Sequence, residues 1–147
     1  MGLRSFLRLA KEFSNITAVK EASGNIDNIM SIIKDKPENF CVISGDDAIT
    51  VPLISVGAEG LISVCGNAFP KETSEMVQFA LNQNFVEAQK IHYKLLDAIT
   101  LMFAEGNPTG VKCFLHKLNR IENYLRLPLV SASSKLENDV NNYLLQV

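Results

Sequence analysis

The chain has 147 residues, 47% of them hydrophobic, which fits one globular domain with a sizeable core. Its 14 Lys and Arg residues against 16 Asp and Glu residues give a formal net charge of −2, without the basic block that favours nucleic acid. No apolar run approaches the roughly 18 residues of a membrane-spanning helix, and the first residues lack the apolar stretch of a signal peptide. We therefore expect no nucleic-acid partner and no membrane partner.

The three cysteines, Cys41, Cys65 and Cys113, are widely spaced along the chain. They form no CxxC pair, so the sequence indicates neither a metal site nor a disulfide framework. Free thiols without a secretion signal are typical of a reducing compartment. We expect a cytoplasmic protein that holds no metal.

In chain order, the first 69 residues alternate between predicted helices and short apolar strands. Helices are expected over residues 4–13, 26–33 and 51–56, and strands over 16–20, 40–44 and 61–64. Either Asn25 or Asp27 can cap the second helix, and either Asp46 or Asp47 the third. The last strand carries no charge, as expected for a parallel strand that is buried on both faces.

From Pro70 onward the pattern is helical throughout, with Pro70 near a first helical position and Asn84 as a cap. Helices are expected over residues 71–81, 85–103, 108–118 and 135–145. No low-complexity linker separates them from the preceding strands. We divide the chain into residues 1–69, which hold three parallel strands with their helices, and residues 70–147, a helical region.

The alternation of strands and helices predicts an α/β fold with a parallel sheet. A complete (β/α)8 barrel has eight strands and typically about 250 residues, so this pattern predicts only part of a barrel. Such a part has open strand edges and an uncovered inner sheet face. Because a bare apolar face usually marks an interface, we expect a homo-oligomer.

Lys20 is the most informative single residue, because it ends an apolar, β-branched strand and a small-residue turn follows it. Period-2 alternation puts Ile16, Ala18 and Lys20 on one face of that strand. The carboxyl ends of parallel strands are where α/β enzymes build active sites. A poorly solvated amine there can attack a carbonyl and form a Schiff base. The alternative is an ordinary, solvated lysine at a strand end.

Five segments carry a family resemblance along nearly the whole chain. They are Val19–Asn25 (VKEASGN), Ile43–Asp47 (ISGDD), Gly60–Val64 (GLISV), Gly106–Lys112 (GNPTGVK) and Leu125–Leu129 (LRLPL). In this order they resemble the second half of dihydrodipicolinate synthases, a family of the N-acetylneuraminate lyase superfamily. The resemblance implies that the three strands are the sixth to eighth of a (β/α)8 TIM barrel. The family's C-terminal helical extension would follow them.

The same resemblance implies a chemistry. Lys20 matches the lysine that forms an imine with pyruvate, which condenses with L-aspartate 4-semialdehyde on the diaminopimelate route to lysine. The imine is covalent, so no cofactor is expected. Gly45 matches a glycine of the pocket wall, with a tight turn as its alternative role. Ile62 matches a residue that lines the pyruvate site, with a plain core position as its alternative.

Other polar residues favour structural roles. Asp46 and Asp47 suit helix capping better than acid–base chemistry, because the free amides of a helix start stabilise a carboxylate. His92 and His116 lie in helical stripes without a nucleophile partner. Arg126 is expected to hold the last loop rather than a substrate.

Some of the family's working residues have no match in this sequence. The Thr-Thr pair that holds the pyruvate carboxylate, the proton-relay tyrosine and the arginine for the second substrate belong to the family's first half. One alternative is therefore a truncated, catalytically incompetent chain that only folds and oligomerises. Another is an N-acetylneuraminate-lyase-type pyruvate aldolase, although Ala22-Ser23-Gly24 after the lysine favours the synthase.

Overall fold

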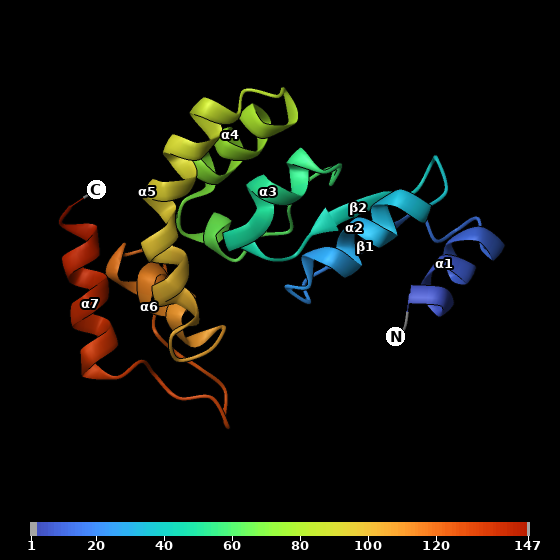
Figure 1. Ribbon diagram of the computed structural model, residues 1–147. Helices are drawn as coiled ribbons and strands as arrows, with labels where there is room; N and C mark the ends of the chain where they lie inside the picture. Colours follow the sequence, from blue (N-terminus) through green and yellow to red (C-terminus); the bar gives the residue numbers. More distant parts are fainter. Residues whose placement is uncertain (1–2, 147) are drawn as a thin grey trace.

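The computed structural model describes residues 3–146, and residues 1, 2 and 147 lie outside this range. Short strands and helices alternate in the first part: α1 (Leu3–Glu12), β1 (Ala18–Glu21), α2 (Ile26–Asp35), β2 (Cys41–Ser44), η1 (Asp47–Ile49), α3 (Thr50–Ser55) and η2 (Cys65–Asn67). Four helices follow: α4 (Pro70–Leu81), α5 (Phe85–Phe103), α6 (Thr109–Lys117) and α7 (Ser134–Leu144). Figure 1 shows the sheet with α1 and α2 at one end of the molecule and α4 to α7 at the other. The predicted order of strands and helices is thus confirmed up to the third strand.

The sheet is parallel, as predicted, but smaller than predicted. Strand β1 pairs with β2 in the register Lys20↔Ile43. The prediction of a full third strand over residues 61–64 is wrong, because this segment forms only one bridge, Ser44↔Leu61. Two hydrogen bonds support it, from Ser44 N to Gly60 O (2.8 Å) and from Ile62 N to Ser44 O (2.9 Å). Beyond Ile62 the amides of Val64 and Cys65 donate to a side chain instead, so the ladder ends there.

Side-chain caps fix where several helices begin. Asn25 caps α2 by accepting from Asn28 N (3.0 Å), so the Asn25 alternative is correct. Asp46 caps η1 by accepting from Ala48 N (3.0 Å). Asn84 caps α5, as predicted. These caps satisfy backbone amides that have no partner inside the helix.

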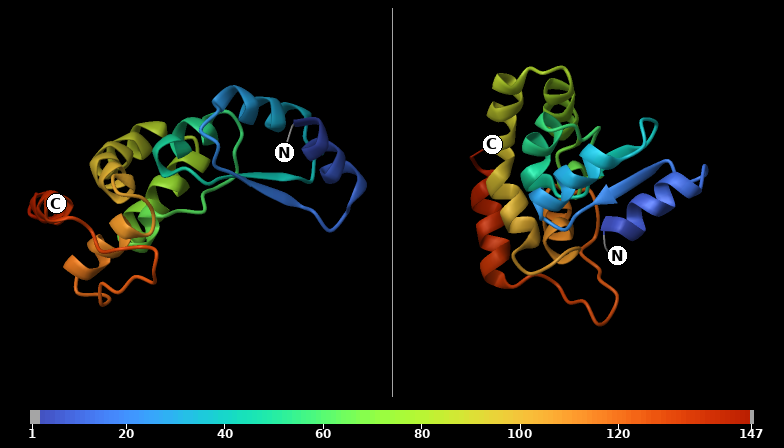
Figure 2. Two further views of the ribbon diagram at one scale, coloured as in Figure 1. Left: turned by 90° about the horizontal axis from the view of Figure 1, so that it is seen from below. Right: turned by 45° about the vertical axis from the view of Figure 1, so that its right-hand side comes forward.

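The helical part packs pairwise around α5. Helices α4 and α5 form a hairpin, and α7 runs alongside α5 in Figure 2. The Tyr143 hydroxyl of α7 donates to the carbonyl of Lys94 on α5 at 2.9 Å. The rings of Phe69, Phe114 and Tyr143 meet edge to face, with centroids 5.8 to 6.0 Å apart. These contacts join the start of α4, where Phe69 is the N-cap residue, to α6 and α7 in one aromatic cluster, here called the aromatic triad.

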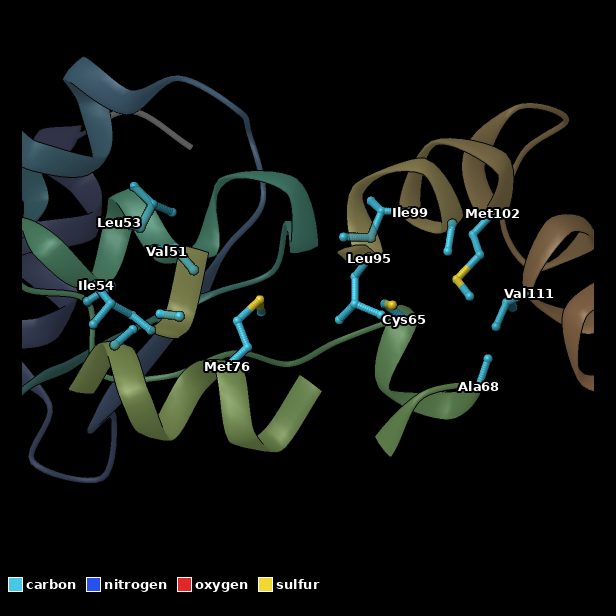
Figure 3. Close-up of a cluster of buried hydrophobic side chains, with 14 of the residues drawn as sticks. Val51, Leu53, Ile54, Cys65, Ala68, Met76, Leu95, Ile99, Met102 and Val111 are labelled. Atoms are coloured by element: carbon cyan, nitrogen blue, oxygen red, sulfur yellow. The ribbon is translucent and has the colours of Figure 1, made fainter. Parts of the chain in front are cut away.

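A single apolar core connects the sheet with the helices. Its members come from α1, α2, β2, α3, η2, the four later helices and the turns between them, and Figure 3 shows a part of it. Val42 of β2 is 1% exposed and lies in this core, whereas its neighbour Ile43 is only half-buried. The helices therefore cover one face of the sheet. Among the described residues the other face stays open, and no helix is long and apolar enough to cross a bilayer.

Candidate active site

The open face of the sheet carries all three residues that the sequence singled out. Side chains alternate along a strand, and Lys20 pairs with Ile43, so Lys20, Ile43 and Gly45 lie on the same side. Leu61 pairs with Ser44, which places Ile62 on that side too. Lys20 and Gly45 lie at the carboxyl ends of β1 and β2, and Ile62 follows the bridge. This is the edge at which parallel-sheet enzymes bind ligands.

Lys20 and Gly45 are in direct contact. A Cβ atom added at Gly45 would lie 2.6 Å from Lys20 Cε and 2.8 Å from Ala22 Cβ, both far inside van der Waals contact. Among the described glycines, positive φ is confined to Gly24, Gly57 and Gly106. Gly45 is therefore required by the close passage of the lysine side chain and not by a left-handed turn. Its amide donates to Glu21 O at 2.7 Å, which joins the ends of the two strands.

A mostly apolar groove of about 380 Å³ begins at this glycine. One wall comes from the turns after β1 and β2, and the other from the last part of α5. The lining residues are Ala22, Gly45, Asp46, Ala48, Ile99, Thr100 and Phe103. Grooves of this size hold small ligands. Neither Ile62 nor Lys20 is part of its lining. Lys20 lies against Gly45, which does line the groove.

The expected burial of the third strand on both faces is wrong, and the first strand is exposed on the same side of the sheet. Ala18 and Lys20 are exposed, and the side chain of Ile62 is 52% exposed. The physical reason is that burial of this face depends on further strands, and the described residues supply none. Position along the strand could be read from the sequence, but solvent access could not.

Asp47 has a role that the sequence did not reveal. It is 1% exposed, and one carboxylate oxygen accepts from the Ser63 hydroxyl. The other oxygen accepts from Val64 N (2.9 Å) and Cys65 N (3.3 Å). Asp47 therefore joins η1 to the segment after the third strand, while Asp46 makes the predicted cap. No local signal separates two adjacent aspartates, so only the fold assigns the two roles.

The three cysteine thiols are poor candidates for chemistry. Burial, with the Asp47 carboxylate as the next cause, raises the pKa of the Cys65 thiol to about 12. A hydrogen bond to Glu59 raises the pKa of Cys41, and burial raises that of Cys113. Because the thiolate is the nucleophile, none of these thiols is activated. No group of three metal-ligating side chains occurs within the described part of the chain.

The two histidines lie away from the groove. His92 is buried in α5, its Nδ1 atom has no hydrogen-bond partner, and burial lowers its pKa. It borders a second cavity of about 320 Å³ between α3 and α5, whose lining includes no Asp, Glu, Lys or Arg. His116 Nδ1 lies 3.2 Å from Ile121 O. These positions suit the structural roles expected for both.

The last loop is held differently from what was expected. Arg126 is exposed, and its carbonyl accepts from Leu129 N at 3.1 Å. It is the Lys112 ammonium that donates to the carbonyl of Tyr124, and the Thr109 hydroxyl donates to that of Val130 at 3.2 Å. Side chains of α6 therefore anchor the loop.

Comparison with known proteins places this geometry in a family. The model of the Dihydrodipicolinate synthetase family matches residues 1–147. The 4-hydroxy-tetrahydrodipicolinate synthase of Phocaeicola vulgatus is 56% identical over 130 residues, which cover 88% of this chain and 44% of that protein. The dihydrodipicolinate synthase structure from Aquifex aeolicus superimposes with a TM-score of 0.95 at 39% identity, over 99% of this chain and 50% of that one.

A second structure comes from Acinetobacter baumannii, a chloride-inhibited dihydrodipicolinate synthase complexed with pyruvate. It matches with a TM-score of 0.93 at 31% identity, over 98% of this chain and 49% of that one. The chain thus spans about half the length of the curated relatives that it matches. Both the sequence identity and the superposition extend over nearly all of its own residues. The chain belongs to the dihydrodipicolinate synthetase family.

Proposed function

We propose that this chain carries the imine-forming part of a pyruvate-dependent class I lyase, with Lys20 as the nucleophile. The observation that carries the proposal is the passage of the Lys20 side chain over Gly45 at the head of the groove. The amine thereby lies at the carboxyl edge of the sheet. The names of the relatives support an enzymatic role, because they are synthases of the same family.

The proposed step is the condensation of an amine with a ketone. The neutral Lys20 amine attacks the carbonyl carbon of pyruvate, one proton is taken up from solvent, water leaves, and a protonated imine remains. Loss of a proton from the pyruvate methyl group then gives an enamine, because the imine nitrogen accepts the electron pair. The enamine carbon attacks an aldehyde, and hydrolysis finally returns the free amine. Gly45 gives the lysine its path, and Ile62 offers an apolar contact on the same face.

The substrates we propose are pyruvate and L-aspartate 4-semialdehyde, in the lysine (diaminopimelate) pathway. Two observations support this choice. The relatives carry the name 4-hydroxy-tetrahydrodipicolinate synthase, and the similar structure from Acinetobacter baumannii is described as complexed with pyruvate. No cofactor is needed, because the lysine itself serves as the electron sink once the imine has formed.

We further propose that these 147 residues alone form the imine but turn over slowly. The tyrosines Tyr93, Tyr124 and Tyr143 lie on α5, after α6 and on α7, so none is placed at the carboxyl edge of the sheet. Positioned proton transfer is worth roughly 10² to 10⁴ in rate. Turnover near the common range of about 1 to 10³ s⁻¹ would contradict this proposal.

The test is chemical trapping. The chain is incubated with pyruvate and sodium borohydride, which delivers hydride to the imine carbon and leaves a stable secondary amine. Peptide mapping by mass spectrometry should find the adduct on Lys20. Lys20→Ala should abolish it, and Lys71→Ala, a change at an exposed lysine of α4, should not. Equal labelling of other lysines, or undiminished labelling in Lys20→Ala, would overturn the assignment.

We also propose that the chain associates with itself through the open face of the sheet. Ala18 and Ile62 are exposed there, and β1 has an unpaired edge among the described residues. Exposed apolar sheet faces and free strand edges promote association. Sedimentation equilibrium at micromolar concentration should find species heavier than the 16.2 kDa monomer. A purely monomeric chain would rule this out.

A further inference from the structure

We propose that Asp47 is a positioning residue, which holds Ile62 on the open sheet face that also carries Lys20. The inference rests on the proposed function of Lys20. Asp47 itself does not line the groove, although its chain neighbours Asp46 and Ala48 do, and its carboxylate is bonded to the segment that follows Ile62. The buried carboxylate, the segment 61–66 and the sheet edge are the three parts of the argument.

Ile62 lies between two anchors. On its N-terminal side, its own amide donates to Ser44 O at 2.9 Å, at the end of β2. On its C-terminal side, the Ser63 hydroxyl and the amides of Val64 and Cys65 all donate to Asp47. Gly66 N also donates to the Ser63 hydroxyl oxygen, at 2.6 Å. Because the backbone is held on both sides of Ile62, this residue has little freedom to move, although its side chain is exposed.

The carboxylate suits this task better than any neutral side chain. A buried charge is stabilising only where donors satisfy it, and Asp47 has three. Charge-assisted hydrogen bonds are about twice as strong as neutral ones. An amide in its place keeps one oxygen for the amides of Val64 and Cys65 and turns the other oxygen into a donor toward Ser63, so the bonds that remain are neutral ones. The clamp therefore depends on the charge and not only on the shape of residue 47.

The same segment contains a natural reporter. Cys65 is 1% exposed, its amide is one of the three donors, and Figure 3 shows its side chain within the buried cluster. Cys113 is also 1% exposed but belongs to α6. Loosening of the clamp exposes Cys65 alone, whereas unfolding exposes both thiols.

The first measurement compares Asp47→Asn with the wild-type chain and with Asp97→Asn, an equal change of charge at an exposed position of α5. A thiol reagent is added at native conditions, and modified cysteines are mapped by mass spectrometry. We expect Cys65 to react roughly tenfold faster in Asp47→Asn only, with Cys113 still protected, as for local opening. An unchanged reaction rate of Cys65, or rates of Cys65 and Cys113 that rise together, would overturn the clamp.

The second measurement is the pyruvate concentration that half-saturates borohydride trapping at Lys20. Loss of one apolar contact in a site changes binding by roughly tenfold, so Asp47→Asn and Ile62→Ala should each raise this concentration to a similar extent. In the double variant the half-saturating pyruvate concentration should be no higher than in either single variant, because Asp47 acts through Ile62. Additive effects would overturn the inference. Ser63→Ala, which removes one donor and keeps the carboxylate, should show a smaller rise in the same direction.

The two measurements separate this inference from the proposed function. If the wild-type chain is not labelled at Lys20, the imine chemistry fails, and the reactivity of Cys65 still decides whether Asp47 holds the segment. If Lys20 is labelled but Asp47→Asn changes neither reading, the imine chemistry stands and the positioning role of Asp47 fails.

Discussion

Replacement of Gly45 by alanine should disable Lys20 without unfolding the chain. Carbon atoms in contact are separated by about 3.5–4.0 Å. The new Cβ would lie 2.6 Å from Lys20 Cε, so the end of the lysine has to move by about 1 Å. That end is flexible and exposed, so most of the overlap is relieved by turning the side chain. The remaining overlap with Ala22 Cβ, at 2.8 Å, costs about 1–2 kcal/mol of stability.

The effect on reactivity should be much larger than the effect on stability. A displacement of about 1 Å can cost 10²-fold in rate, so we expect trapping of pyruvate at Lys20 to slow roughly 10- to 100-fold. The assay is borohydride trapping, with the urea midpoint as the measure of folding. Gly60→Ala is the matched control, because its Cβ would lie 3.7 Å from Ile43 Cδ1, an ordinary contact on the same sheet face. A folded Gly45→Ala chain that is labelled at the wild-type rate would refute the reasoning.

Three further predictions concern stability. In Gly110→Ala the new Cβ would lie 2.2 Å from the carbonyl oxygen of Met102, a backbone atom that cannot turn away. We therefore expect the free energy of unfolding, measured in urea, to fall by more than about 3 kcal/mol. A decrease below about 1 kcal/mol would contradict the close packing of α6 on α5. Phe114→Ala empties the centre of the aromatic triad and should cost about 3–5 kcal/mol by the same measurement, with a near-neutral effect as the contrary result. Burial lowers the pKa of His92 below the ordinary 6.5, so the unfolded chain takes up a proton first as the pH falls, and stability present above about pH 6.5 is lost below it. Urea midpoints at pH 7.5 and 5.5 should differ less in His92→Phe than in the wild type, and equal differences would show that His92 is not the group responsible.

Local patterns in the sequence were enough to predict most helices and two strands. Capping residues such as Asn25 and Asn84 act on amides three positions away, so their effect can be read from neighbouring letters. The end of the third strand could not be read in this way. Its partner is Asp47, which lies 17 residues before Val64 in the sequence. An uncharged run such as 61–64 looks the same whether it continues a ladder or turns away toward a carboxylate.

In the candidate site, too, local sequence patterns predicted some features, and contacts between distant segments decided the others. Lys20, Gly45 and Ile62 were singled out by matched motifs, and period-2 alternation placed Lys20 on its face of β1. The contact of Lys20 with Gly45 follows from the strand register Lys20↔Ile43, which no single segment encodes. The role of Asp47 follows from the folding of residues 61–66 over it. Contacts between segments distant in the sequence are therefore the part that only the fold reveals.

The way α7 is docked has a consequence for the continuity of the polypeptide. The stretch between α6 and α7 is largely exposed and contains no regular helix or strand. Helix α7 itself is held by three contacts. The Tyr143 hydroxyl donates to Lys94 O, and the Tyr143 ring packs in the aromatic triad. Glu137 forms an ion pair with Lys117 at 3.1 Å. A protease that severs the stretch would break the covalent chain without removing any of these contacts. The two pieces should then elute together from a sizing column and part only in denaturant.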